Sequence, residues 1–151
     1  MLIAVNARLE VIDKNGTQLI PLEKIYTGNG ILPRNLSKTA IIKSILLPVN
    51  QKYFCIFKKL RPREAVDFTS LTTAVSMDGP GKMRIVIGGV DPKPVLIETT
   101  KTADLEDIIK QTLKRSRIVD NDFYSRSYRR EMIRVFLQES FEQLKSFRNY
   151  A

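Results

Sequence analysis

The sequence contains no histidine, no tryptophan and one cysteine, Cys55. Without histidine, the chain by itself cannot form a Ser-His-Asp triad, a histidine-ligated zinc site or a histidine general base. A single cysteine excludes an internal disulfide and a cysteine cluster for zinc or iron–sulfur. No apolar run approaches the roughly 18 residues of a membrane span, and the N-terminus lacks a signal-peptide pattern. These absences predict a soluble protein of a reducing compartment, which we expect to be the cytoplasm. No catalytic and no metal-binding residue is predicted in this chain.

The composition is that of a globular domain, and its balance of charge is basic. Of the 151 residues, 43% are hydrophobic and 27% are charged, and the net charge is +9. A pI near 9.8 raises the alternative of a basic α+β domain that binds nucleic acid or serves as an assembly unit. The excess is spread along the chain, with clusters at residues 58–63 and 114–134. Spread charge of this kind is more typical of a solvated or docking surface.

Strands are predicted in the first two thirds of the chain, where β-prone or alternating apolar segments are bounded by turn residues. The predicted strands are residues 7–11, 17–20, 40–47, 53–57, 71–77, 83–90 and 95–97. Residues 13–16 and 78–81 supply turns, because asparagine and glycine tolerate the positive φ of tight hairpins. Residues 21–26 predict a short helical turn. The continuous apolar run at residues 40–47 predicts a buried strand.

Helices are predicted in the last third of the chain, where apolar residues recur at helical spacing. Residues 105–113 form one such segment, with Thr102 as its candidate N-cap. The second helix spans about residues 125–147. Its predicted buried stripe is Tyr128, Met132, Val135, Phe136 and Leu144, widened by Ile133, Leu137 and Phe141. Strands followed by helices predict an α+β fold, in which an antiparallel sheet at residues 50–97 packs against the C-terminal helices.

No single motif in the chain defines an active site. Gly28-Asn29-Gly30 is not a dinucleotide fingerprint and is interpreted as a helix stop. Gly88-Gly89 fits a strand end where side chains would clash, although it could also bring the backbone close to a ligand. Cys55 is interpreted as a small core residue. The basic segment at residues 58–63 could bind phosphate, a cofactor or an acidic partner, or could simply be a solvated loop.

Taken in order, four parts of the chain resemble the FAD subunits of the molybdenum hydroxylases. That family includes xanthine dehydrogenase, carbon monoxide dehydrogenase and 4-hydroxybenzoyl-CoA reductase. The similar parts are residues 20–28 (IPLEKIYTG) with residues 42–48 (IKSILLP), residues 57–75 with the spacing Lys-x-x-x-Arg-x-x-x-Asp, residues 84–94 (RIVIGGVDPKP) and residues 128–130 (YRR). Together they cover nearly the whole chain.

The resemblance implies that residues 1–49 are the last strands of a flavin-binding subdomain. Residues 50–151 would form a CO dehydrogenase flavoprotein C-terminal-like domain. In this family the flavin subunit transfers electrons through FAD between a [2Fe–2S] subunit and an external acceptor, and substrate chemistry belongs to a molybdopterin subunit. The positions implied to contact the isoalloxazine are Ile42 and Lys59. A cationic lysine there would stabilise the anionic reduced ring.

Subunits of this family begin with a glycine-rich region, roughly as long as this chain, which holds the FAD pyrophosphate. The present sequence starts just before the last strands of that flavin domain. We therefore expect another polypeptide to supply the glycine-rich half, unless the chain is a truncated product. The chain alone is expected neither to retain FAD nor to be catalytic. Its expected partners are that half, a [2Fe–2S] subunit and a molybdopterin subunit. No membrane is expected, and a nucleic-acid-binding or assembly domain without a redox role is the less favoured alternative.

Overall fold

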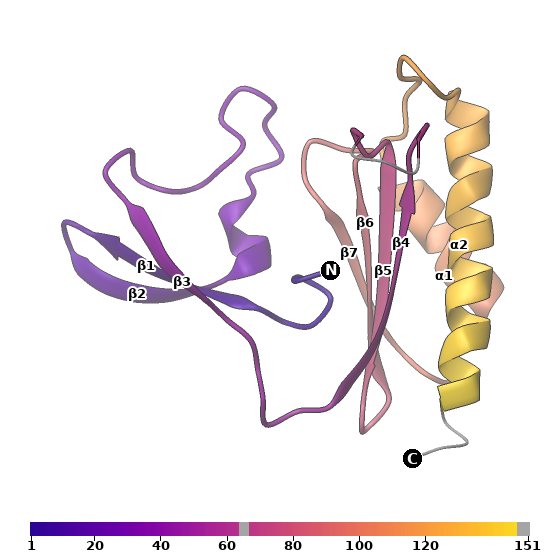
Figure 1. Cartoon of the computed structure of the whole chain (residues 1–151), viewed down its shortest axis with the longest axis horizontal. Coiled ribbons are helices and arrows are strands. Elements are labelled where there is room, and N and C mark those ends of the chain that lie inside the picture. The colour runs from indigo at the N-terminus through magenta and orange to yellow at the C-terminus, as the bar shows by residue number, and fades with distance from the viewer. Residues whose placement is uncertain (64–66, 148–151) are drawn as a thin grey trace.

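A computed structural model describes residues 1–63 and 67–147, which form two antiparallel sheets and two α-helices (Figure 1). The elements in chain order are β1 (Arg8–Asp13), β2 (Gly16–Pro21), the 3-10 helix η1 (Leu22–Ile25), β3 (Ile41–Leu46), β4 (Tyr53–Leu60), β5 (Leu71–Asp78), β6 (Lys82–Gly88), β7 (Val95–Thr100), α1 (Leu105–Arg115) and α2 (Arg126–Phe147). The predicted α+β fold class is confirmed. β4 is longer than predicted, because it continues through the first part of the basic segment to Leu60.

The N-terminal part is a three-stranded sheet in the order β2-β1-β3. The β1–β2 hairpin turns at Gly16, whose φ of 106° suits glycine, and the Asn15 amide donates to the carboxylate of Asp13 at 2.8 Å. On β1, the alternating Leu9 and Val11 are buried, as their period predicts. They belong to a cluster that also contains residues of η1, so η1 covers this face of the sheet.

The strand predicted to be buried, β3, is an exposed edge strand of this sheet. The side chains of Ile41, Ile42, Ile45 and Leu46 are between 43% and 66% exposed. The prediction of burial was therefore wrong for the chain as described. The physical reason is that a continuous apolar run needs cover on both faces, and no element among the described residues provides it for β3.

The C-terminal part is a four-stranded antiparallel sheet in the order β4-β5-β6-β7, covered on one face by both helices. α2 packs on β4 and β5, and α1 packs beside β7 (Figure 1). Gly81, with a φ of 90°, lies in the β5–β6 turn that the sequence predicted. The main core lies between this sheet and the helices and includes Val75, Ile85, Ile97 and Ile109, each fully buried.

The buried stripe of α2 differs from the predicted stripe at its N-terminal end. Ile133, Leu137, Phe141 and Leu144 are buried, whereas Tyr128 is 45% exposed. The prediction for Tyr128 was therefore wrong. Met132 and Phe136 are partly buried at the margin of the core, and Val135 is half-buried. The helical period, traced back from Ile133, places the residue after Tyr128 on the buried face.

The N-terminus of α1 is capped by Asp104 rather than by Thr102. The carboxylate of Asp104 accepts a hydrogen bond from the Asp107 amide at 3.1 Å, and the Thr102 hydroxyl instead pairs with that of Thr100 at 2.9 Å. Aspartate at this position also suits the helix dipole. In the part of the chain that the structure describes, no helix is both long and apolar enough to span a membrane.

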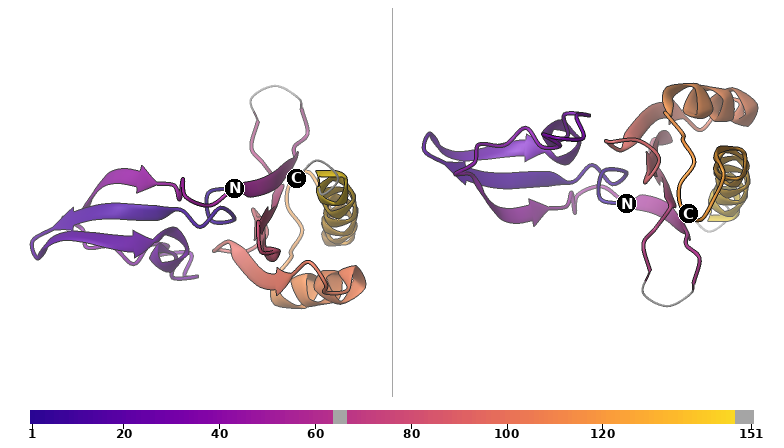
Figure 2. Two further views of the ribbon diagram at one scale, coloured as in Figure 1. Left: turned by 90° about the horizontal axis from the view of Figure 1, so that it is seen from below. Right: turned by 90° about the horizontal axis from the view of Figure 1, so that it is seen from above.

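The two sheets are joined by a second core cluster on the face of the four-stranded sheet that the helices do not cover. Figure 2 shows the N-terminal part on one side of this sheet and the helices on the other. Ile3, Leu22 and Ile25 from the N-terminal part pack with Ala74 of β5 and Val86 of β6. The division of the chain into residues 1–49 and 50–151 stays a prediction, because this shared packing does not test it.

Candidate functional site

Lys59 lies near the C-terminal end of β4, an edge strand of the four-stranded sheet. It pairs with Thr72 on β5 and lies on the same face of β4 as Phe57 and Cys55, which are two and four residues earlier. Cys55 packs in the cluster shared with the N-terminal part, so Lys59 lies on the face of the sheet that points toward that part. Its ammonium is 5.3 Å from the centre of the Phe57 ring, a cation–π distance. Lys59 is thus an accessible cation held over an aromatic ring.

Ile42 lies near the beginning of β3, opposite Val11 on β1, and is 43% exposed. It belongs to a different sheet from Lys59, and Figure 1 shows β3 well away from the C-terminal end of β4. Both residues are described, and no hydrogen bond, ion pair or ring contact joins them. The structure shows that both are accessible and does not bring them together. Their contact with a flavin stays a prediction.

The basic segment at residues 58–63 does not form one continuous cationic patch. Lys58 points to the helix side, where its ammonium meets the Glu139 carboxylate at 2.5 Å and lies 5.9 Å from the Phe136 ring centre. Arg63 pairs with Asp67, four residues later, at 2.9 Å. This hydrogen bond from the guanidinium lowers the pKa of the Asp67 carboxyl. Because the cations are divided between two faces and their own acidic partners, the nucleic-acid alternative is not favoured.

Arg129 of α2, the middle residue of the YRR motif, is a buried cation to which the sequence interpretation gave no role of its own. Arg129 is 2% exposed, and its guanidinium donates three hydrogen bonds to backbone carbonyls. The acceptors are Val119 at 2.5 Å, Ser70 at 2.6 Å and Gly89 at 2.6 Å. Burial lowers the pKa of Arg129, and the nearby Asp120 opposes that shift. The arginine therefore ties three connections to the first turn of α2, beside an open cavity of about 640 Å³.

The connection between β6 and β7 requires a glycine at position 89. Its φ is +81°, and a Cβ built on it would lie 3.0 Å from the Ser70 carbonyl oxygen. The close approach is therefore to a neighbouring strand connection, which confirms the interpretation of Gly88-Gly89 as a strand end where side chains would clash. A Cβ on Gly88 would likewise meet the Thr72 hydroxyl at 2.6 Å. The backbone at Gly88 and Gly89 therefore packs against other parts of the chain and does not face open space.

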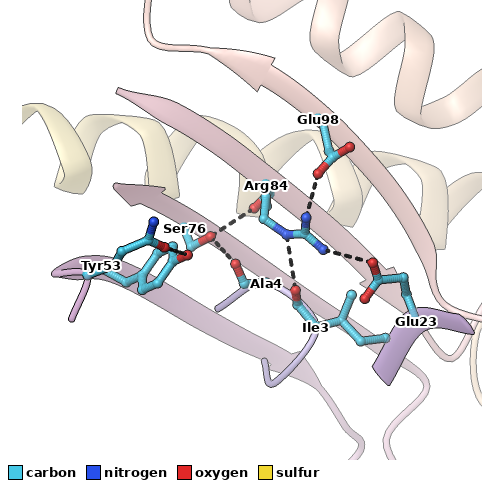
Figure 3. A network of polar contacts seen from close by, with 8 residues as sticks. Ile3, Ala4, Glu23, Tyr53, Ser76, Arg84 and Glu98 are labelled. Carbon is cyan, nitrogen blue, oxygen red and sulfur yellow. Dashed lines mark hydrogen bonds and ion pairs between the residues drawn. The ribbon is translucent and has the colours of Figure 1, made fainter. Parts of the chain in front are cut away.

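A polar network fastens the N-terminal segment to the four-stranded sheet (Figure 3). Arg84 on β6 forms an ion pair with Glu98 of β7, lies 3.7 Å from the Glu23 carboxylate of η1, and donates to the Ile3 carbonyl at 3.2 Å. The buried hydroxyl of Ser76 on β5 donates a hydrogen bond to the carbonyl of Ala4, the residue after Ile3. These contacts fix the approach of the N-terminal part to the sheet that carries Lys59. Sequence reasoning could not find them, because the partners are up to 81 residues apart.

The remaining candidates offer no separate chemistry. Burial is the main cause that raises the pKa of the Cys55 thiol, and the thiol is half-buried in the cluster between the sheets. This agrees with its interpretation as a small core residue, since a reactive thiol needs a lowered pKa. No group of three or more acidic or cysteine residues that could hold a metal ion occurs among residues 1–63 and 67–147.

Comparisons with known proteins define the fold. No family model matches the chain. It is similar to a chain of the Cu,Mo-CO dehydrogenase in its cyanide-inactivated form, with a TM-score of 0.77 and 18% identity, over 95% of this chain and 54% of that chain. It is also similar to the reconstituted CO dehydrogenase from Oligotropha carboxidovorans (TM-score 0.76, 17% identity, 96% and 55%). A third match is quinoline 2-oxidoreductase from Pseudomonas putida 86 (0.73, 14%, 94% and 53%).

The chain thus has the fold of chains found in CO dehydrogenase and quinoline 2-oxidoreductase, and it spans about half of their length. The predicted fold, a CO dehydrogenase flavoprotein C-terminal-like sheet and helices preceded by further strands, is confirmed. The resemblance that was based on four short motifs therefore extends to the arrangement of the whole described chain.

Proposed function

We propose that this chain is the C-terminal part of the flavoprotein subunit of a molybdenum hydroxylase-type oxidoreductase. The observation that carries the proposal is the match of 95% of the chain to a Cu,Mo-CO dehydrogenase chain, in the region where the motifs of this family occur in order. In the assembly, FAD would relay electrons between a [2Fe–2S] subunit and an external acceptor. A molybdopterin subunit would carry out the substrate chemistry, and the complex would be cytoplasmic.

The residues present fit the ring side of FAD better than its pyrophosphate side. Lys59 is an accessible cation that can stabilise a negatively charged reduced ring, and Ile42 offers accessible apolar surface. A pyrophosphate needs glycine amides that point into open space. A Cβ on Gly89 would meet the Ser70 carbonyl instead, and one on Gly28 would meet the side chain of Lys93. Gly16, Gly30 and Gly79 are open, but they lie far apart in the sequence and do not form one glycine-rich loop. The amides for the pyrophosphate would therefore come from a glycine-rich half that lies outside these residues.

The magnitudes agree with this division of roles. Burial of Ile42 and one charge-assisted hydrogen bond from Lys59 contribute about 1–3 kcal/mol together. A micromolar complex requires about 8 kcal/mol. The chain alone should therefore be colourless and should lose added FAD on gel filtration. A yellow preparation of this chain alone, with stoichiometric FAD after gel filtration, would contradict the proposal.

The role of Lys59 is tested in the assembly with the glycine-rich half. Lys59→Ala should lower the flavin midpoint potential while changing FAD affinity less than tenfold, because the lost charge acts mainly on the reduced ring. Lys52→Ala is the matched control, since Lys52 is also exposed and directly precedes β4. Spectroelectrochemical titration measures the potential. Equal potentials in the two variants would remove Lys59 from the site.

A further inference from the structure

A cavity of about 490 Å³ lies where the N-terminal part meets the β7 edge of the four-stranded sheet. One side of the cavity is formed by η1 and Tyr26, and the other by the β6–β7 connection, the start of β7 and the end of α1. Figure 2 shows η1 beside β7, whereas β4 is the strand at the other edge of this sheet. Because Lys59 lies on β4, the cavity is separate from the position expected to contact the flavin.

Three cations from three separate segments line this cavity. They are Lys24 of η1, Lys93 of the β6–β7 connection and Arg115 in the last turn of α1. All three are exposed, and none forms an ion pair or a side-chain hydrogen bond with any residue that the structure describes. By contrast, Lys43 and Lys58 each meet a carboxylate, at 2.8 Å and 2.5 Å. The cavity thus gathers cations that have no protein partner among the described residues.

The two acidic side chains that line the cavity have partners outside this set of cations. Glu23 lies 3.7 Å from the guanidinium of Arg84 (Figure 3). Asp91 accepts a hydrogen bond from the Arg117 amide at 3.0 Å. Since Arg84 balances the charge of Glu23, positive charge prevails around the cavity. An anion that enters it would meet cations that no described carboxylate occupies.

The backbone around Lys93 restricts where this lysine can lie. Pro92 and Pro94 flank it in the sequence, and each proline fixes its own φ. The stem of Lys93 passes close to Gly28, because a Cβ built on Gly28 would lie 3.3 Å from Lys93 Cδ. Tyr26, two residues before Gly28, is half-buried and adds a hydroxyl group to the lining. A side chain that is already restricted loses less conformational freedom when it binds a ligand.

We propose that this cavity binds a phosphate group, either as free phosphate or as part of a small phosphorylated molecule. A phosphate monoester carries about two negative charges at neutral pH, which suits three cations around one cavity better than a single carboxylate does. The lysines would act as point charges, and the Arg115 guanidinium can donate two parallel hydrogen bonds to two oxygens. The site uses neither Ile42 nor Lys59, so it does not depend on the proposed function.

The test is an amide NMR titration of the chain with two probes, inorganic phosphate and ribose 5-phosphate. Chloride keeps the ionic strength constant, so that screening of the charges does not change during the titration. Both probes should produce saturable shifts at the amides of Tyr26, Gly28 and Lys93. Tighter binding of ribose 5-phosphate would identify a small phosphorylated molecule as the ligand, and equal affinity would identify free phosphate.

Matched variants separate the cavity from the general charge of the chain. Lys93→Met and Arg115→Met should each weaken phosphate binding at least about fivefold, because each removes a charged donor. Lys114→Met is the matched control, since Lys114 is exposed in the same turn of α1 but does not line the cavity. Lys14→Met, in the β1–β2 turn, is a second control. Each control also removes one positive charge and should change the affinity less than about twofold.

Three results would overturn the proposal. Shifts that stay linear with phosphate concentration would show that no site is being filled. Equal losses of affinity in the cavity variants and in the controls would show only a general attraction to the net charge of +9. A glutamate-rich peptide that causes saturable shifts at the cavity, where both phosphate probes cause none, would assign the cavity to an acidic protein segment instead.

Discussion

The replacement of Arg129 by methionine tests whether the first turn of α2 is held by a buried cation. The guanidinium donates to the carbonyls of Val119, Ser70 and Gly89, which come from three different connections. Methionine preserves much of the packing of the arginine stem but donates no hydrogen bond. The variant therefore isolates the contribution of the three donors.

The structure sets the magnitude of the expected loss. Three hydrogen bonds from a charged donor contribute about 1.5–3 kcal/mol each, and their acceptors would be left without these donors. Two features reduce that sum. The guanidinium is itself desolvated, which lowers its pKa, and an open cavity of about 640 Å³ beside it can admit water to the carbonyls. We expect Arg129→Met to lower the free energy of unfolding by about 3–5 kcal/mol.

Urea unfolding followed by circular dichroism measures this loss. Arg126→Met is the control, because Arg126 is an exposed arginine on the same turn of α2, and it should change stability by less than about 0.5 kcal/mol. Arg129→Lys should fall between the two variants, since a lysine cannot reproduce the planar fork of donors. A loss below about 1 kcal/mol in Arg129→Met would refute the role of the three hydrogen bonds.

Three further changes test separate contacts. Gly89→Ala should cost about 1–3 kcal/mol in urea unfolding because of its positive φ, and an unchanged midpoint would contradict the strain. Lys43→Met should raise the pKa of Glu10, which the hydrogen bond from Lys43 lowers, as measured by NMR titration. Because the folded-state pKa is lowered, this contribution to stability is present above the unfolded-state pKa and is lost as pH falls through the folded-state value. A double-mutant cycle on Lys58 and Glu139 should give a coupling of about 0.3–1 kcal/mol, reduced by salt; zero coupling would show that the pair is not formed in solution.

The elements could be predicted because their signals are local. Each signal comes from residues that are close together in the sequence. Examples are the period of two in β1, the turn that contains Gly81 and the helical spacing in α2. The burial of Arg129 was not predicted, although the residue belongs to the YRR motif and lies four residues before Ile133, on the buried face of α2. An arginine counts as polar in any hydrophobic pattern. Only the three carbonyls that approach it in the folded chain make its burial favourable.

The candidate site was less predictable than the fold, because side-chain partners come from distant segments. Lys58 and Lys59 are adjacent in the sequence and both cationic, but they point to opposite faces of β4. Lys58 meets Glu139, 81 residues away, while Lys59 remains over Phe57. If the predicted strand had included both lysines, the alternation of side chains along a strand would have placed them on opposite faces. Their different surroundings would still have required the positions of α2 and of the N-terminal part.

β3 is the element whose observed environment differs most from the one that its sequence predicts, because it is exposed where burial was expected. Its residues are those of an inner strand, whereas its place is an edge with both faces exposed. Complete burial of an isoleucine or leucine contributes about 1.5–3 kcal/mol, so four such side chains left about half exposed forgo about 3–6 kcal/mol. Local patterns that conflict with the fold tend to mark functional sites. The free energy that β3 leaves unused within this chain is available to an element that packs against its faces.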